Sequence, residues 1–465
     1  MTSTVTAVPW AGPVDLPLSG ELDVQAACGL MHVHGRRFGR PTALGLDYAS
    51  IVAAELDAIG ASALEVARLR GVPVRTVSTS VAQAALLAVS QYLAAATADE
   101  VDSVFVGVGG PPFVSCDGVA FEVEALDAEV WRRFWAALDA DPGAVAWGWR
   151  PFQQRFATAT CPLPPELTGL AAGLPIVLLE RIAKLTGTTL VRVSHRAVDD
   201  LPPYRVRPLG AGSGPVGAGL RHSGVLPLSG VVVLESCRRV QGPLAGHLLW
   251  QLGASVVRIE PPGGDPLRGV PPMSGEVSAR FHALNRGKRV VEVDLGTVAG
   301  RREVLELASG ADVFLHNWGP GKAEAWSLRA RDVARVRPGI VYAYASGWGD
   351  ALGPRPPLGT DFVVQAHAGV PPSLMTIVDV FGGVVCVRGV VDGLVRRILS
   401  GVGQSVASSL LSAASWLNAR ASRRCTAPLS VPVCTDLAAL GRDSRFSRAV
   451  VRDGCVVPVS AWEFG

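Results

Sequence analysis

Asp379 is the residue whose setting most favours covalent chemistry. It is the one charged residue in the apolar run LMTIVDVFGGVV (374–385), which has the pattern of a helix start. Free N–H groups in the first turn of a helix carry partial positive charge, which would keep the carboxylate ionised. Such a carboxylate can act as a nucleophile in group transfer. An aspartate at a helix start also satisfies backbone donors as an N-cap, so a structural role stays open on spacing alone.

Two turns next to expected strands are suited to holding a ligand. One separates a strand from a helix and offers backbone amides at close range. The other follows the strand DVFLHN, and ligands of α/β proteins gather at the carboxyl ends of strands. Turn geometry and core packing are the structural alternatives for both. The residues are Val240, Gln241, Gly242, Asn317, Trp318 and Gly319.

A glycine-rich stretch, FVGVGGPP (105–112), contains Gly107, Gly109 and Gly110. Glycines suit a loop that approaches a reactive centre without side chains and changes conformation. A tight loop that leads into a strand would have the same composition.

The elements that must position these residues alternate between strands and helices in the second half of the chain. This alternation predicts an α/β fold with a parallel, doubly wound sheet and ligands outside the strand carboxyl ends. Upstream, residues 209–227 are rich in Gly and Ser without periodicity, which predicts an interdomain linker. The expected strands are 230–236, 255–262, 288–295, 312–317 and 340–349, and the expected helices are 244–254 and 302–311.

One segment occurs twice in the chain. Residues 19–30 pair without a gap with residues 359–370, and the two share Gln, Ala and Gly positions. Ser50 stands ten residues before Gly60, as Asp379 stands ten before Gly389. Each copy is then expected to continue into a serine-containing helix, over 78–93 in the first and 405–417 in the second.

From Pro227 onward the sequence resembles the family III CoA-transferases of the CaiB/BaiF type, which include formyl-CoA transferase, carnitine CoA-transferase and α-methylacyl-CoA racemase. The run PLSGVVVLESCRRVQGPLAGHLLWQLGASVVRIEPPGGDPLRG is similar to the N-terminal signature of that family. FHALNRGKRVVEVDL, HNWGPG and YAYASGWG are similar to its later blocks. GLMHVHGRRFGRP and GVGGPPFVSCDGVAFEVEALDAEVWRRFW, near the N-terminus, resemble the rest of the same family in a displaced order.

The resemblance implies a Rossmann-like parallel sheet as the large domain and a smaller α+β domain, in a permuted family III CoA-transferase architecture. Residues 1–98 would be a duplicated, non-catalytic copy of a large-domain segment, and 99–208 the small domain with the glycine loop. Residues 209–226 would be a linker. Residues 227–465 would form the CoA-binding large domain with the catalytic aspartate.

The resemblance also implies a reaction. Asp379 occupies the position of the family's nucleophile, which attacks an acyl-CoA and then carries CoA as an aspartyl thioester before a carboxylic acid takes its place. Asp361 falls on a CoA-contacting acidic position, and the two turns resemble the family's CoA contacts. The glycine loop would close over Asp379. CoA and acyl-CoA would be substrates rather than permanently bound cofactors, and a homodimer is expected because relatives form interlocked rings.

Several positions depart from the family pattern. Where basic residues commonly hold the CoA phosphates, this chain has Gly296 and Ala325, which leaves only nearby candidates. The Gly/Pro-rich loop that usually precedes the nucleophile is missing before Asp379 and is present only in the first copy, at 34–41. The nearby basic candidates are Arg258, Arg268, Lys288 and Lys322.

Two other functions stay open. A racemase of this family would need an acid/base pair, but the histidine of its relatives is replaced by Thr360, whose hydroxyl is a poor base. A catalytically inactive acyl-CoA-binding protein would be consistent with the missing loop and basic positions. In the first copy Ser50 cannot act as a carboxylate, and Asp47 is the local substitute. We expect that copy to be structural.

Composition bears on nucleic-acid binding, metal binding and cellular location. The chain has 43 Lys+Arg and 40 Asp+Glu among 465 residues, and it lacks a basic run with aromatics of the kind that binds nucleic acid. Its eight cysteines lack zinc-site spacing, so we expect reduced thiols and no metal. We expect no membrane span and, because the N-terminus lacks a signal-peptide pattern, a cytoplasmic location.

Overall fold

The computed structural model describes residues 8–102, 104, 107, 109–198, 200–210, 224–422 and 428–465. Residues 211–223, most of the expected linker, lie outside the described residues. None of the described helices is long and apolar enough to cross a membrane.

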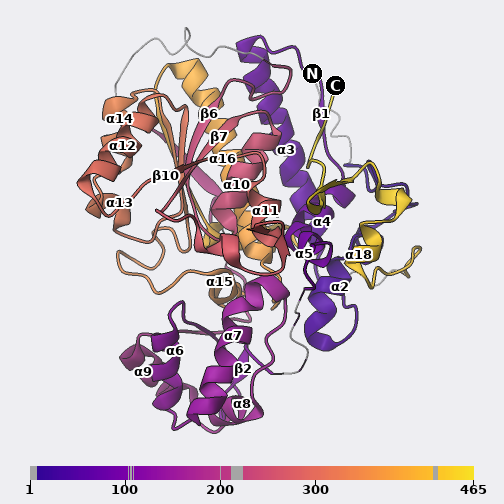
Figure 1. The fold of residues 1–465 in the computed structure, drawn as a ribbon, viewed down its shortest axis with the longest axis vertical. Helices are drawn as coiled ribbons and strands as arrows, with labels where there is room; N and C mark the ends of the chain where they lie inside the picture. Colours follow the sequence, from indigo (N-terminus) through magenta and orange to yellow (C-terminus); the bar gives the residue numbers. More distant parts are fainter. Residues whose placement is uncertain are drawn as a thin grey trace.

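A seven-stranded sheet forms the centre of the molecule (Figure 1). Six strands run parallel, and the seventh, β5, pairs antiparallel with β13 at one edge. This confirms the α/β fold with a parallel sheet. The strand order is β10 (Arg289–Glu292), β7 (Ser255–Glu260), β6 (Val232–Ser236), β11 (Val313–His316), β12 (Val341–Ser346), β13 (Gln404–Ser409) and β5 (Tyr204–Pro208).

Helices cover both faces of this sheet, as a doubly wound fold requires. On one face, α10 (Gln241–Gln251) packs beside α16 (Ile377–Ser400), and α16 also contacts β12 and β13. On the other face, α12 (Val298–Ser309) and α14 (Ala330–Val336) enclose a separate apolar core with side chains such as Phe314. The central strands β6, β11 and β12 are buried on both faces, which explains their apolar runs.

The repeated segment forms two sets of equivalent helices. The first copy contains α1 (Glu21–Ala27), α2 (Leu30–Gly35), α3 (Tyr48–Arg70), α4 (Val81–Ala88) and α5 (Ser90–Ala96), and the second contains α15 (Asp361–Ala368), α16 and α17 (Leu410–Arg420). The expectation of a helix over 405–417 was wrong in its first part. Residues 404–409 form β13, because Val406 is buried between neighbouring strands, and the helix begins only after Ser409.

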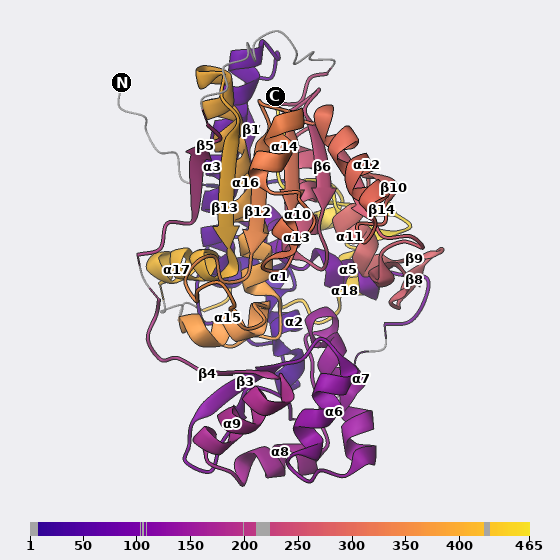
Figure 2. The same cartoon turned by 90° about the vertical axis from the view of Figure 1, so that its left-hand side faces the viewer.

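A smaller α+β unit lies below the large sheet, next to α15 (Figure 2). Its helices pack on a short antiparallel sheet, and Trp131 stacks on Phe152 in its core with ring centres 4.3 Å apart. The unit contains β2 (Phe113–Val114), β3 (Ala120–Glu124), β4 (Thr189–Arg192), α6 (Ala128–Ala136), α7 (Pro142–Thr158), α8 (Pro165–Ala172) and α9 (Ile176–Thr186).

The chain ends return to the first copy. The strand β16 (Glu463–Phe464) pairs antiparallel with β1 (Val77–Ser78), and Trp462 donates a hydrogen bond from its ring to Leu56 O of α3 at 2.9 Å. The hairpin of β14 (Val450–Asp453) and β15 (Cys455–Pro458) lies before it, with β15 against α5. The C-terminal segment therefore fixes the first copy in place.

Candidate functional site

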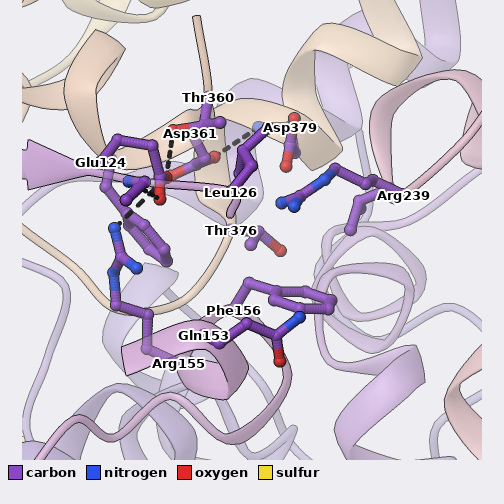
Figure 3. A pocket seen from close by; sticks show the side chains of 13 residues that line it. Glu124, Leu126, Gln153, Arg155, Phe156, Arg239, Thr360, Asp361, Thr376 and Asp379 are labelled. Atoms are coloured by element: carbon purple, nitrogen blue, oxygen red, sulfur yellow. Dashed lines mark hydrogen bonds and ion pairs between the residues drawn. The ribbon is translucent and has the colours of Figure 1, made fainter. Parts of the chain in front are cut away.

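A small pocket, with a cavity volume of about 20 Å³, lies where the small unit meets the carboxyl edge of the large sheet (Figure 3). Its walls combine residues that are more than 200 positions apart in the sequence, from β3 and α7 on one side and from α15, α16 and the loop before α10 on the other. The lining residues are Glu124, Ala125, Leu126, Gln153, Arg155, Phe156, Arg239, Val240, Thr360, Asp361, Phe362, Thr376 and Asp379.

Asp379 is the third residue of α16, and its half-buried carboxylate faces this pocket. The carboxylate accepts no hydrogen bond from the described residues, so it does not cap its own helix in the way the structural alternative requires. Burial raises the pKa of Asp379 to about 7. Arg239 opposes that rise through its positive charge, and Glu124 adds to it.

Asp361 is hydrogen-bonded to the first turn of α16. It is only 2% exposed, and its Oδ2 accepts a hydrogen bond from the backbone N–H of Asp379 at 2.6 Å. Its other oxygen accepts from the side chain of Gln365, which also reaches Ser373 O at 3.1 Å. Burial, and then the charge of Asp379, raises the pKa of Asp361 well above its usual range. The residue expected to contact CoA therefore lies beneath Asp379 rather than beside Asn317.

The small unit contributes an acidic wall. Thr360 donates a hydrogen bond to Glu124 Oε2 at 2.5 Å, and the same carboxylate lies 3.2 Å from the guanidinium of Arg155. Arg155 also approaches Glu122 at 3.6 Å, and burial raises the pKa of Glu122 to about 7. The buried arginine is thus shared between two carboxylates and has little capacity for a third.

The loop between β6 and α10 is clamped by the turn that follows β11. Asn317 exchanges two hydrogen bonds with the backbone of Arg238, at 2.9 and 2.8 Å, and Trp318 donates from its ring to Ser236 Oγ at 3.0 Å. Arg239, which follows Arg238 in this loop, has a φ of +65°, in the left-handed region. Sequence reasoning missed Arg239, although it directly precedes the expected ligand turn.

α10 begins at Gln241, so the expected turn residues Gln241 and Gly242 form its first helical turn. A Cβ on Gly242 would lie 2.5 Å from Cys237 Sγ and 3.2 Å from Asn317 Cγ, which only glycine avoids. Gln241 packs against Gly382 and Gly383 of α16, and its buried Nε2 has no hydrogen-bond partner among the described residues. Gln241 therefore brings an unused donor within one helical turn of Asp379.

A second cavity of about 410 Å³ opens at the carboxyl ends of β6, β7 and β11. Asn317, Trp318 and Gly319 line it together, and their contact with CoA stays a prediction. Lys322 and Arg238 also line it, and the Lys322 ammonium lies 5.5 Å from the ring centre of Trp326. This cavity lies at the carboxyl ends of parallel strands and has aromatic walls, as expected for a site that binds the nucleotide part of CoA.

Most of the nearby basic candidates are already paired. Arg258 is 1% exposed and contacts Glu235, Glu260 and Asp265 at 2.5 to 3.0 Å. The ammonium of Lys288 is buried 2.8 Å from Glu235, and Arg268 lies 2.7 Å from Glu260. Because a buried ion pair loses much if one partner turns away, these three residues are structural cations here. Lys322 is the remaining candidate from that set.

The three glycines of the expected substrate loop pack against residues 161–163. Gly107, Gly109 and Gly110 all have positive φ, between 79° and 147°. A Cβ on Gly110 would lie 2.2 Å from Cys161 O, and one on Gly107 would lie 2.9 Å from Pro162. None of the three is among the described residues that line the pocket of Asp379. Closure of this loop over Asp379 stays a prediction.

In the first copy, the position equivalent to Asp379 is Ser50, and its side chain is already hydrogen-bonded. Ser50 donates from its backbone N–H, at 2.8 Å, and from its hydroxyl, at 2.5 Å, to Glu21 Oε2. Asp47, the local substitute for a carboxylate, accepts a hydrogen bond from the backbone N–H of Ser422 at 2.8 Å. Within the described residues, no three His, Cys, Asp or Glu side chains gather in a metal-binding arrangement.

Residues 228–432 match the sequence model described as CoA-transferase family III. We call these matched residues the family III segment. The family III segment includes Arg239, Asn317, Asp361 and Asp379, whereas the opposite wall of the pocket, from Glu124 to Phe156, lies outside it.

Relatives with this family III segment include several named enzymes. The chain is 35% identical over 209 residues to the probable fatty acyl-CoA transferase Rv3272 of Mycobacterium tuberculosis, covering 42% of this chain and 52% of that one. It is 32% identical to the succinyl-CoA:glutarate CoA-transferase of Homo sapiens, covering 40% and 46%. It is 31% identical to the acetyl-CoA:oxalate CoA-transferase of Acetobacter aceti, covering 40% and 51%. The chain thus spans about half the length of these curated relatives.

Solved structures with similar sequences cover about two fifths of the chain. A CaiB/BaiF family protein from Brucella suis is 31% identical and covers 41% of this chain and 55% of that one, with a TM-score of 0.39. The structure of Rv3272 is 34% identical and covers 42% and 58%, also with a TM-score of 0.39.

Proposed function

We propose that this chain transfers CoA from an acyl-CoA to a carboxylic acid through a covalent thioester on Asp379. The observation that carries the proposal is the Asp379 carboxylate. It faces a pocket and lacks an internal hydrogen-bond partner among the described residues. It belongs to the segment that matches CoA-transferase family III. Two of the relatives are named CoA-transferases, and the third is named a probable fatty acyl-CoA transferase.

The reaction divides a difficult exchange into easier steps. A carboxylate oxygen of Asp379 attacks the acyl carbon of the donor thioester, the carbon–sulfur bond breaks, and a mixed anhydride forms while CoA leaves as a thiolate. The thiolate then attacks the Asp379 carbonyl and releases the donor acid. The acceptor acid attacks the resulting aspartyl thioester, which forms a second anhydride and releases the CoA thiolate. The thiolate then attacks the acceptor's carbonyl carbon, which gives the new acyl-CoA and frees the Asp379 carboxylate.

The surrounding residues have distinct proposed roles in these steps. Asp361 fixes the first turn of α16 through its hydrogen bond to the Asp379 N–H, so that the nucleophile keeps its direction. The unused Nε2 of Gln241 could donate to the developing oxyanion, since a pre-positioned donor stabilises such charge without reorganisation. The cavity with Asn317, Trp318 and Lys322 would hold the nucleotide end of CoA.

A racemase receives less support from the same contacts. The hydroxyl of Thr360, at the position where racemase relatives carry histidine, donates its hydrogen to Glu124 and is therefore occupied. An inactive acyl-CoA-binding protein would need no reactive carboxylate. The half-buried Asp379 in an open pocket favours transfer over that alternative.

Mass spectrometry of the intact protein tests the proposal. The protein is incubated with acetyl-CoA, succinyl-CoA and longer acyl-CoAs, and peptide mapping then locates any CoA adduct. We expect an adduct on Asp379 with at least one donor, removed by hydroxylamine, and none in the Asp379→Ala variant. Binding of acyl-CoA without any adduct or exchange would support the inactive alternative, and loss of the α-proton without CoA exchange would support the racemase.

The oligomeric state is a separate proposal. A homodimer was expected because relatives form interlocked rings, and because the rearranged order makes Asp379 depend on docking of a distant small domain. In this structure Glu124, Gln153 and Phe156 already approach Asp379 within one chain. We keep the homodimer as a proposal that sedimentation at micromolar concentration tests. A compact monomer would contradict it and would still contain a complete pocket wall.

A further inference from the structure

Arg239 is a cation in the Asp379 pocket that forms no salt bridge with any carboxylate among the described residues. Its guanidinium lies 5.7 Å from the ring centre of Phe156, on the opposite wall, and it forms no hydrogen bond or ion pair with any residue that the structure describes. The other arginine of the pocket, Arg155, is buried and shared between Glu122 and Glu124. Arg239 is exposed at the mouth and is free to receive an anion.

The backbone of Arg239 is held in a costly conformation that aims the side chain. Its φ of +65° is uncommon for a residue with a side chain, and such outliers gather at functional sites. The two hydrogen bonds from Asn317 to Arg238 keep the preceding residue in place, and Val240 is 1% exposed on the other side. Figure 3 shows the guanidinium of Arg239 extending toward Asp379.

The charge of the pocket changes during the proposed reaction. While Asp379 is ionised, it and Arg239 offset each other across the pocket. Once Asp379 carries CoA as a thioester, its negative charge is gone and Arg239 remains as an uncompensated cation next to the reactive carbonyl. The remaining carboxylates cannot replace it, because Glu124 is paired with Arg155 and Asp361 is buried beneath the helix start.

We propose that Arg239 binds the carboxylate of the acceptor acid and directs it onto the aspartyl thioester of Asp379. The proposal rests on the function proposed above and adds the residue that recognises the acceptor. A guanidinium offers two parallel N–H donors to one carboxylate, which fixes its orientation as well as its charge. Acceptors are therefore small acids whose carboxylate reaches the pocket between Arg239 and Phe156.

The step assisted by Arg239 balances without another reactant. One oxygen of the acceptor carboxylate attacks the Asp379 carbonyl carbon, the bond from that carbon to the CoA sulfur breaks, and the thiolate leaves with the electron pair. The anhydride so formed is attacked by the thiolate at the acceptor carbonyl, which yields the new acyl-CoA and returns Asp379 as a carboxylate. No proton is consumed, because both acids react in their ionised forms.

Single-turnover kinetics separate this role from a general effect on Asp379. The thioester form is made with a labelled acyl-CoA, freed of excess donor, and mixed with increasing succinate, acetate or oxalate. We expect Arg239→Gln to raise the half-saturating acceptor concentration by about 10- to 100-fold, in line with loss of a charge-assisted arginine–carboxylate pair. Thioester formation, measured at about pH 9 where Asp379 is ionised, should slow by less than about threefold.

Two further variants complete the experiment. Arg239→Lys keeps the charge but loses the two-pronged geometry, so its acceptor requirement should lie between wild type and Arg239→Gln. Arg181→Gln, an exposed arginine on α9, is the matched control and should behave as wild type. An unchanged half-saturating concentration in Arg239→Gln would overturn the proposal, as would a loss confined to thioester formation. If the wild-type protein forms no thioester at all, the proposed function fails first.

Discussion

The two copies of the repeated segment use the same hydrogen-bond network around different reactive positions. In the first copy, Gln25 donates to Glu21 and to Leu46 O, and accepts from the N–H of Leu44. In the second copy, Gln365 donates to Asp361 and to Met375 O, and accepts from the N–H of Ser373. An acid at the start of a short helix therefore fixes the start of the following long helix in both.

The difference lies in what the long helix presents. Glu21 is one methylene longer than Asp361, and it accepts both the backbone N–H and the hydroxyl of Ser50. Asp361 accepts the backbone N–H of Asp379 and leaves that side chain to the pocket. The same arrangement of helices thus holds the Ser50 side chain in a hydrogen bond in one copy and leaves the Asp379 carboxylate facing the pocket in the other. A fold match alone would not distinguish them, since function depends on the site rather than the architecture.

The closed copy also supports the open one. α3 packs along α16, with Glu55 accepting from Arg388 at 2.5 Å and Ser62 donating to Asp392 at 2.9 Å. The hydroxyl of Tyr48 donates to Ile377 O, in the first turn of α16, at 2.7 Å. The first copy therefore contributes to the rigidity of the helix that carries Asp379, which is a structural role consistent with its own lack of a carboxylate at Ser50.

The largest expected difference between the copies is in CoA exchange. Asp379→Ala should abolish exchange and the CoA adduct, a loss of several orders of magnitude, because only a carboxylate at that position can form the anhydride and then the thioester. Ser50→Ala should leave exchange within about twofold of wild type, since the hydroxyl only contacts Glu21. Exchange of labelled CoA between acids measures both variants. Retained exchange in Asp379→Ala would remove the nucleophile from the proposal.

Removal of the two buried acids should separate stability from activity. Asp361→Ala removes the acceptor of the Asp379 N–H and one of the acceptors of the Gln365 amide. Glu21→Ala removes the acceptor of the Ser50 N–H and one of the acceptors of the Gln25 amide. Each variant should lower the free energy of unfolding by about 1–3 kcal/mol, the usual cost of buried unsatisfied donors. Urea denaturation measures this cost.

Only Asp361→Ala should also slow thioester formation, by about 10- to 100-fold, because misdirection of a positioned group costs rate. Glu21→Ala serves as the matched control for lost stability without lost positioning. Equal rates of thioester formation in the two folded variants would show that Asp361 does not orient Asp379.

The sequence predicted the fold better than the pocket. Strands β6, β7, β11 and β12 were predicted because each is a short apolar run, whereas β5, with the sequence YRVRP, is an edge strand whose charged side chains hide it. β13 was taken for helix because its serines lack an alternating apolar pattern. The edge strand also lies in the segment 99–208, although it pairs with the large sheet.

The candidate site was predictable where neighbours in sequence are neighbours in space. Asn317, Trp318 and Gly319 line one cavity because they form one turn after one strand. Glu124 and Phe156 could not be placed beside Asp379, because their approach depends on how the small unit docks against α15. Arg239 was missed because its left-handed backbone, which aims it into the pocket, has no signature in a non-glycine residue.

The pH dependence of thioester formation tests whether the open copy titrates as its environment indicates. Burial raises the pKa of Asp379 to about 7, and only the ionised form is a nucleophile. The rate should therefore rise about tenfold between pH 6 and pH 8. Glu21→Gln should leave this profile unchanged. A rate that is flat over this range would contradict the raised pKa.

The same shift has a stability consequence with a definite sign. Because the folded-state pKa of Asp379 lies above its ordinary value of 3.8, the folded protein binds the proton more tightly than the unfolded chain. Its contribution to the free energy of unfolding is present below about pH 4 and is lost as the pH rises through 7. In Asp379→Asn that part of the decline should be absent, which urea denaturation at several pH values would detect.

The smallest expected effect concerns the helix caps that the two copies share. Ser80 Oγ accepts the N–H of Gln83 at 3.2 Å at the start of α4, and Ser409 Oγ accepts the N–H of Ser412 at 2.9 Å at the start of α17. Ser80→Ala and Ser409→Ala should each lower the free energy of unfolding by about 1 kcal/mol, the usual worth of a serine N-cap. Neither should alter thioester formation by more than about twofold, because neither side chain lines the pocket of Asp379. If thermal and urea denaturation give equal costs in the two variants, the copies are equivalent as scaffolds and differ only in chemistry. A much larger loss of unfolding free energy in Ser409→Ala, together with slower thioester formation, would mean that the N-cap of α17 also stabilises the position of α16. The two copies would then be equivalent only in the hydrogen bonds around Gln25 and Gln365.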